Sequence, residues 1–178
     1  MAKSCNPDNV WQPFGAFSMM VMQGSGQVVH LKGQVSLDAS GTIIGPGDMR
    51  IQVRQVLTNI KTVLSAAGGK MSDIISLTHY TSDIQAFMQT GDIRQEFFAE
   101  PYPVTTTVEV AALYNADLVV EITAIAEIPE VRYKAPPKAK AMHLWSSVRL
   151  GISFQTGENP SCTGHFVRSG IGSPFAWG

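Results

Sequence analysis

The sequence predicts an α+β fold, in which a mixed six-stranded sheet carries two helices packed on one face. Three observations support this prediction. Segment 48–67 repeats apolar residues at the 3.6-residue period of a helix, whereas segments 103–111 and 117–127 alternate with the two-residue period of a strand. The expected elements follow the order ββ(β)αβαββ. Because helices and strands are interleaved in this way, the helices are expected to form one layer on one sheet.

Two strands are expected near the N-terminus. Segments 17–22 and 27–32 are apolar and flank the glycine-containing segment 23–26, which predicts a hairpin. The Gly-Ser-Gly of this turn is followed by a strand, whereas a phosphate-binding loop needs a helix there. Residues 36–48 are predicted to form a loop around a short strand at 42–44.

The first helix is predicted over 48–67, with Asp48 as its N-cap and Gly68 and Gly69 ending it. The residues expected on its inward face are Val53, Val56, Leu57, Ile60, Val63, Leu64 and Ala67. The β-branched segment that follows, 73–80, predicts the next strand.

The second helix is predicted over 84–99. Ser82 or Asp83 can cap its start, and Pro101 and Pro103 prevent its continuation. Its expected inward residues are Ile84, Phe87, Met88 and Phe98. Two strands, 103–113 and 117–128, then complete the sheet.

The composition changes after residue 130. Residues 1–130 contain 7 Lys and Arg against 13 Asp and Glu, a net charge of −6, whereas residues 131–178 contain 6 against 1, a net charge of +5. We therefore expect one folded domain over 1–130 and a basic, Gly- and Pro-containing C-terminal extension of unknown role over 131–178. An acidic domain repels phosphates, so nucleic acid is disfavoured as a partner.

The sequence lacks the motifs that define several classes of protein. No apolar run reaches the roughly 18 residues of a membrane span, and the first residues lack the apolar core of a secretory signal, so a cytoplasmic protein without a membrane partner is expected. Cys5 and Cys162 form no CxxC motif or disulfide framework. The four histidines lack zinc-ligand spacing, and no Gly-x-Ser-x-Gly elbow is present. We expect no metal and no cofactor.

Side-chain alternation predicts which face of the sheet carries chemistry. The even positions of 103–111 and 117–127 are mostly apolar and should lie under the helices, so the odd positions should face away. That open face would expose apolar side chains, which favours self-association with pockets at the seams. The pocket candidates on this geometry are His30, Lys32, Thr105, Thr107 and Glu121. Two of them have an ordinary alternative, because Glu121 can be a solvated or salt-bridged group and Lys32 a surface lysine.

The order and spacing of several strings resemble the reactive-intermediate deaminase (Rid, or YjgF-type) family. These strings lie at 33–38, 52–68, 73–80, 107–113 and 120–126, and the similarity covers roughly residues 14–128. The resemblance implies a chorismate-mutase-like fold and a homotrimer with a small-molecule ligand cleft between each pair of subunits. It also implies hydrolysis of enamines or imines to a carbonyl compound and ammonia.

The resemblance assigns roles to individual positions. The family's water-positioning glutamate matches Glu121, and its pocket glycine matches Gly33, so both are retained. The arginine that grips the substrate carboxylate matches Thr105. The other departures are Phe17 near the family's tyrosine, Lys32 near its serine, Gly91 near its asparagine and Thr107 near its cysteine. A threonine hydroxyl offers one neutral hydrogen bond where a guanidinium offers two charge-assisted bonds.

Two functions from different classes therefore stay open. The first is an imine or enamine deaminase in which Glu121 positions water, Lys32 replaces the lost cation, and Thr105 and Thr107 donate hydrogen bonds. The second is a metabolite-binding trimer that has kept the cleft and lost the chemistry, which the missing arginine favours. Endoribonuclease activity is a weaker third hypothesis, because the domain is acidic.

Overall fold

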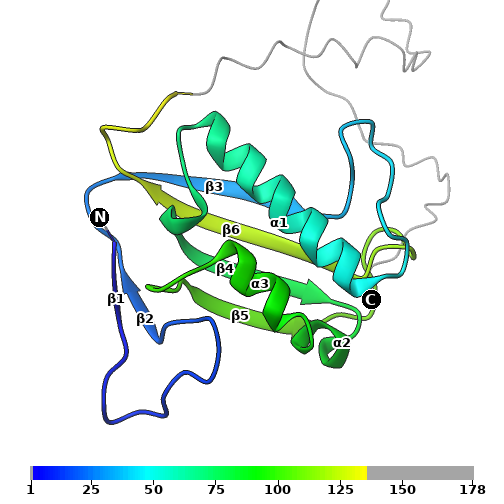
Figure 1. Cartoon of the computed structure of the whole chain (residues 1–178), viewed down its shortest axis with the longest axis horizontal. Helices are drawn as coiled ribbons and strands as arrows, with labels where there is room; N and C mark the ends of the chain where they lie inside the picture. Colours follow the sequence, from blue (N-terminus) through cyan, green and yellow to red (C-terminus); the bar gives the residue numbers. More distant parts are fainter. Residues whose placement is uncertain (1, 136–178) are drawn as a thin grey trace, which may run out of the picture. The chain divides into compact units, whose positions relative to one another are not determined.

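The computed structural model describes residues 2–135, and most of the predicted extension 131–178 lies outside them. The described chain is an α+β domain with one mixed sheet, as predicted (Figure 1). The sheet has the spatial order β3 (Gln27–Gln34), β6 (Val120–Ile128), β4 (Ile74–Thr81), β5 (Val104–Glu109). β6 is antiparallel to both of its neighbours, whereas β4 and β5 are parallel.

The number of strands in this sheet differs from the expected six. In the described residues it has four, because β1 (Lys3–Cys5) and β2 (Met20–Met22) pair only with each other in a separate two-stranded sheet. The predicted hairpin between 17–22 and 27–32 is therefore absent. The expected strand at 42–44 is reduced to a single bridge between Leu37 and Ile43.

The glycine turn after β2, residues 23–26, bonds to Glu127 at the end of β6 and does not connect two paired strands. The N–H groups of Gly24 and Gly26 donate to the carboxylate of Glu127 at 2.6 and 3.0 Å. A Cβ on Gly26 would lie 2.7 Å from the carbonyl oxygen of Ile128, so only glycine fits there. The turn is thus bound to the end of β6, and β2 is free to pair with the N-terminal segment.

The first helix forms where it was predicted. α1 spans Met49–Ala66, the Asp48 carboxylate accepts a hydrogen bond from the Ile51 N–H at 2.9 Å, and Gly68 follows with a φ of +77°. Val63 was expected to face inward and is 45% exposed instead. It lies at the edge of the apolar stripe, where the 3.6-residue period alone does not separate buried from exposed positions.

The second predicted helix is divided into α2 (Ile84–Met88) and α3 (Gly91–Phe97). Asp83 caps α2 by accepting from the Ala86 N–H at 2.9 Å. The division follows from Thr90, which is fully buried and whose hydroxyl donates to the carbonyl of Phe87 at 2.7 Å. A threonine that binds backbone in this way competes with the helical ladder, and glycine at 91 is a weak helix former. Met88, expected inward, is 46% exposed beside the break.

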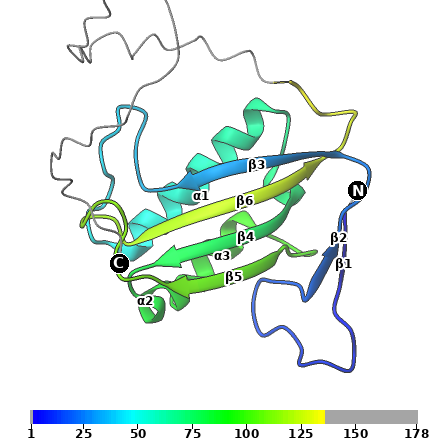
Figure 2. The same ribbon diagram turned by 180° about the vertical axis from the view of Figure 1, so that it is seen from behind.

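The helices cover one face of the sheet, and in the described residues the other face carries no helix (Figures 1 and 2). The core between the layers includes the even positions of β6, as the alternation predicted. These are Val120, Ile122, Ala124 and Ala126, each fully buried. Within residues 2–135, none of the helices has the length and apolar character of a membrane span.

One buried polar side chain fixes α1 against the start of β6. The amide of Gln52 donates to the carbonyls of Gly45 and Asp117 at 2.8 and 2.6 Å and accepts from the Val119 N–H at 2.9 Å. Gln52 is completely buried, so these three bonds replace the water it has lost. They position Val120 and, beyond it, the residue that follows on the open face, Glu121.

Candidate functional site

Glu121 lies on the helix-free face of the sheet, as the alternation predicted. It follows the buried Val120 on β6 and stands opposite Tyr80 of β4 in the strand register. Its carboxylate lies directly over Gly33, where an added Cβ would come within 1.9 Å of Glu121 Oε1. Only glycine fits at position 33, because the Glu121 carboxylate occupies the space of a side chain.

The backbone beside Glu121 is irregular. The register between β3 and β6 shifts between Leu31 and Gln34, so Lys32 and Gly33 form a bulge. The Lys32 ammonium is exposed and donates to the Gly33 carbonyl at 3.1 Å. Bulges change the direction of side chains at the edges of sheets. This bulge places the Lys32 ammonium beside Gly33, the glycine over which the Glu121 carboxylate lies. His30, two residues before Lys32 on β3, is also exposed on the open face.

Thr105 and Thr107 face the opposite way from Glu121, and the expectation that the odd positions of both strands share the open face is wrong for β5. Thr105 pairs with Leu77 and Thr107 with His79, and both β4 residues are buried on the helix side. Paired residues on neighbouring strands project to the same face. The even residues of β5 are correspondingly open, with Val108 38% exposed.

The error in β5 has a physical cause. The sequence pattern assumes that the helix-covered face must be apolar, but β5 is the edge strand, and the space between it and α3 is a pocket rather than packed core. Polar threonines are tolerated there because they reach solvent or a ligand. The valines at the even positions look like core residues but lie on the open face.

This pocket has a volume of about 410 Å³ and is lined by the N-terminal segment, α3 and β5. It contains four of the residues that the sequence singled out, namely Phe17, Gly91, Thr105 and Thr107. It does not contain Lys32, Gly33 or Glu121, which lie on the other side of the sheet. Within one copy the predicted site residues thus form two separate groups.

Several residues of the pocket were not anticipated from the sequence. Trp11, Phe14 and Phe17 form an aromatic cluster with ring centroids 5.3 to 5.9 Å apart, and Arg94 projects from α3. The spacing of three residues between the aromatics and between Gly91 and Arg94 was the available signal. This spacing alone did not predict a pocket, because no neighbouring residue in the sequence indicated one at these positions.

The floor of the pocket is electrostatically unusual. His79 is buried beneath Thr107, with its Nδ1 2.9 Å from the threonine hydroxyl. Burial, and to a lesser degree the positive charge of Arg94, lowers the pKa of His79 to about 3. Burial also lowers the pKa of Arg94, although a guanidinium remains protonated at neutral pH. The imidazole is therefore neutral, and the positive charge at this end of the sheet belongs to Arg94.

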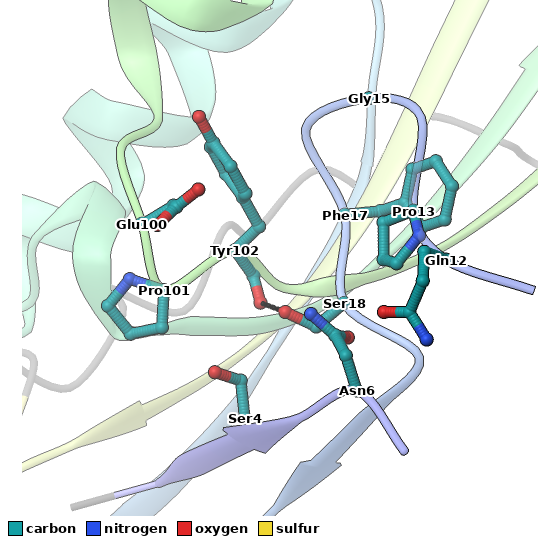
Figure 3. A pocket seen from close by; sticks show the side chains of 10 residues that line it. All are labelled: Ser4, Asn6, Gln12, Pro13, Gly15, Phe17, Ser18, Glu100, Pro101 and Tyr102. Atoms are coloured by element: carbon teal, nitrogen blue, oxygen red, sulfur yellow. Dashed lines mark hydrogen bonds between the residues drawn. The ribbon is translucent and has the colours of Figure 1, made fainter. Parts of the chain in front are cut away.

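A second cavity adjoins the first and shares Gly15 and Phe17 with it. Figure 3 shows its lining, in which the N-terminal segment meets the loop before β5 and Ser18 donates to the carbonyl of Tyr102 at 2.7 Å. Its one charged residue is Glu100, and the rest of the lining is neutral. Phe17 thus lines both a cavity with a carboxylate, Glu100, and a pocket with a guanidinium, Arg94.

No group of three or more His, Cys, Asp or Glu residues in the described part of the chain is arranged to hold a metal ion. The polar groups that the candidate site residues offer are the Glu121 carboxylate, the Arg94 guanidinium, the Lys32 ammonium and the hydroxyl groups of Thr105 and Thr107. This set suits binding of a small anion and activation of water.

The comparisons with known proteins agree with this fold. Residues 8–128 match the family model described as Endoribonuclease L-PSP. A RutC family protein of Pyrococcus horikoshii is 36% identical over 119 residues, which cover 67% of this chain and 92% of the relative. A 2-iminobutanoate/2-iminopropanoate deaminase of Dermatophagoides farinae is 33% identical over 65% of this chain and 90% of its own.

A crystal structure of a Rid-family protein from Yersinia pestis, whose function is described as unknown, matches with a TM-score of 0.63 and 30% identity. That match covers 71% of this chain and 98% of the Yersinia chain. The chain belongs to the Rid, or YjgF-type, family. The family predicted from the sequence is confirmed.

Proposed function

We propose that this protein is a hydrolytic deaminase of small imines or enamines, which acts at clefts between the subunits of a homotrimer. Two of the relatives described as deaminases, from Dermatophagoides farinae and Bos taurus, support the reaction class at 33% identity each. Glu121, held over Gly33, supplies the carboxylate that such a reaction needs.

The observation that carries the proposal is the division of the site between the two faces of the sheet. Glu121 lies on the open face, and the pocket with Thr105 and Thr107 lies on the helix side. One copy cannot present both groups to one small ligand. A second copy can, if its open face closes the mouth of the first copy's pocket.

The surface of the pocket is suited to being covered. Trp11 and Phe14 at its mouth are 61% and 78% exposed, and Val108 is exposed on the open face of β5. Clustered exposed aromatics of this kind mark interaction surfaces. A contact between two different patches forms a ring when its rotation closes, and a cyclic trimer is one such ring.

The proposed chemistry balances without a cofactor. The Glu121 carboxylate accepts a proton from a water molecule, whose oxygen then attacks the imine carbon. The imine nitrogen takes up that proton, which gives the neutral carbinolamine. The proton of the carbinolamine hydroxyl then passes through the carboxylate to the nitrogen, the C–N bond breaks as the C=O bond forms, and ammonia leaves with a carbonyl compound as the other product. The pocket across the cleft holds the substrate so that its imine carbon faces the carboxylate.

The test is to generate 2-iminobutanoate in solution and to measure its loss by trapping with semicarbazide. Glu121→Gln keeps the shape of the side chain and removes its basicity, so kcat should fall by about 100-fold or more. The matched control is Glu130→Gln, at an exposed glutamate whose side chain accepts a hydrogen bond from Gln27, and it should keep the wild-type rate. A wild-type rate in Glu121→Gln, or a monomer at assay concentration, would overturn the proposal.

Thr105, at the family's arginine position, favours a second candidate, a trimer that binds a metabolite without turning it over. Calorimetric binding of a 2-oxo acid, with no imine loss above the uncatalysed rate, would support it. The family model's description also names ribonuclease activity. RNA cleavage by the wild type that Glu121→Gln lacks would support that third function instead.

A further inference from the structure

We propose that Arg94 is the carboxylate-binding residue of the pocket, and that the preferred ligands are small carboxylates with an apolar side chain. This inference rests on the proposed function, because it assigns a substrate class to the same site. It assigns to α3 the cation that the rest of the family carries at the position of Thr105 on β5.

The geometry places the guanidinium where an anion would bind. Arg94 lies one turn after Gly91 on α3, and both line the pocket together with Thr105 and Thr107. A Cβ built on Gly91 would meet only Arg94 Nη2, at 3.9 Å. The glycine therefore leaves open space beside the guanidinium, and the two threonines offer hydroxyl groups from the opposite wall.

Arg94 has no counter-charge in the part of the chain that the structure describes. Its neighbours on α3 are acidic, but Asp92 forms a bidentate pair with Arg50 and Glu96 with Arg54, both on α1. No Asp or Glu lines the pocket. The guanidinium is thus a partly buried cation that faces a cavity without an anion, and buried charges are normally paired.

The side chain is also held in place. Its Cζ lies 4.9 Å above the ring of the fully buried Phe87, and its Nε is buried without a hydrogen-bond partner. An unsatisfied buried donor costs stability, and such groups call for an explanation. A guanidinium fixed by stacking can bind a carboxylate without first losing conformational freedom.

The remaining walls indicate what the carboxylate is attached to. Trp11 stacks on Phe14, both contact the ring of Phe17 edge-to-face, and Met88 adds a further apolar surface. A volume of about 410 Å³ exceeds what a two- or three-carbon acid fills. The pocket therefore suits an acid whose side chain reaches the aromatic cluster.

The test measures binding of two stable probes that differ only in charge, 3-phenylpropanoate and 3-phenylpropanamide, by calorimetry on the full chain. The wild type should bind the carboxylate at least tenfold more tightly than the amide. Arg94→Met keeps the packing on Phe87 and should weaken carboxylate binding by about 10- to 100-fold while leaving amide binding within about twofold. Arg94→Lys should recover part of the loss, because an ammonium restores the charge without the fork.

Two matched variants complete the design. Lys61→Met removes an exposed cation of α1 that does not line the pocket, and it should change neither affinity. Lys32→Met tests the alternative cation on the open face. Equal carboxylate affinity in the wild type and Arg94→Met would overturn the inference, as would a loss confined to Lys32→Met. Because binding is measured without turnover, a failure of imine hydrolysis leaves this result interpretable.

Discussion

Replacing His79 with glutamine should remove most of the dependence of folding stability on pH between pH 7 and 5. His79 is 1% exposed and lies between the ring of Phe87 and the hydroxyl of Thr107. Its pKa is about 3 in the folded chain, mainly because of burial and secondly because of Arg94. In the unfolded chain the imidazole returns to its ordinary value of about 6.5.

The sign follows from these two values. Because the folded pKa is depressed, the unfolded chain binds more protons as the pH falls below 6.5, so the free energy of unfolding decreases until the folded pKa is reached. Two-state linkage with pKa values of about 6.5 and 3 gives a loss of about 2 kcal/mol between pH 7 and pH 5. Most carboxylates ionise below this pH range, so they contribute little to the change in the free energy of unfolding between pH 7 and pH 5. His79 should therefore account for most of that change, which the variant should lack.

The assay is urea unfolding at equal protein concentration, at pH 7 and pH 5, because stability of an oligomer depends on concentration. Glutamine keeps a polar group that can bond to Thr107 and does not titrate. The wild type should lose about 2 kcal/mol over this range and His79→Gln less than about 0.5 kcal/mol. Equal losses in the two proteins would refute the reasoning that His79 is buried in its neutral form.

Two further predictions concern the elements that support Glu121. Gly33→Ala places a methyl group where the Glu121 carboxylate lies, so kcat for 2-iminobutanoate hydrolysis should fall by about 10- to 100-fold. The midpoint of thermal unfolding should stay within a few degrees of the wild-type value, because the displaced atoms are the end of a flexible side chain. An unchanged kcat would contradict the close approach of Glu121 to Gly33. Gln52→Leu leaves the Val119 N–H without its partner and removes one of the two hydrogen bonds that the Gly45 and Asp117 carbonyls each accept, so the free energy of unfolding should fall by about 2 kcal/mol or more in urea. The exposed control Gln27→Leu should lose less than about 0.5 kcal/mol, and similar losses in both would contradict the role given to Gln52.

The parts of the fold that could be predicted are those that local pattern controls. α1 was found with its N-cap Asp48 because an 18-residue amphipathic helix has many apolar positions to define its period. The direction of Glu121 was predicted because β6 lies inside the sheet, where one face must be buried along its whole length. The division into α2 and α3 was missed because it depends on the buried hydroxyl of Thr90.

The candidate site was only half predictable. Phe17, Gly91, Thr105 and Thr107 came from the family resemblance, and the structure brings them to one pocket. Arg94 was not singled out because a charged residue on a surface helix is usually solvated. Its place beside the pocket depends on Asp92 and Glu96 pairing with arginines of α1, a contact between segments some 40 residues apart in sequence.

The sequence by itself determined the α+β class, the position of the long helix and the open-face direction of Glu121, because hydrophobic period and strand alternation are local properties. Only the tertiary structure decided that Thr105 and Thr107 face the helices, since the direction of an edge strand depends on its register with β4. It also decided that the site is divided between two faces of one sheet. Long-range pairing sets both, and no local segment of the chain encodes it alone.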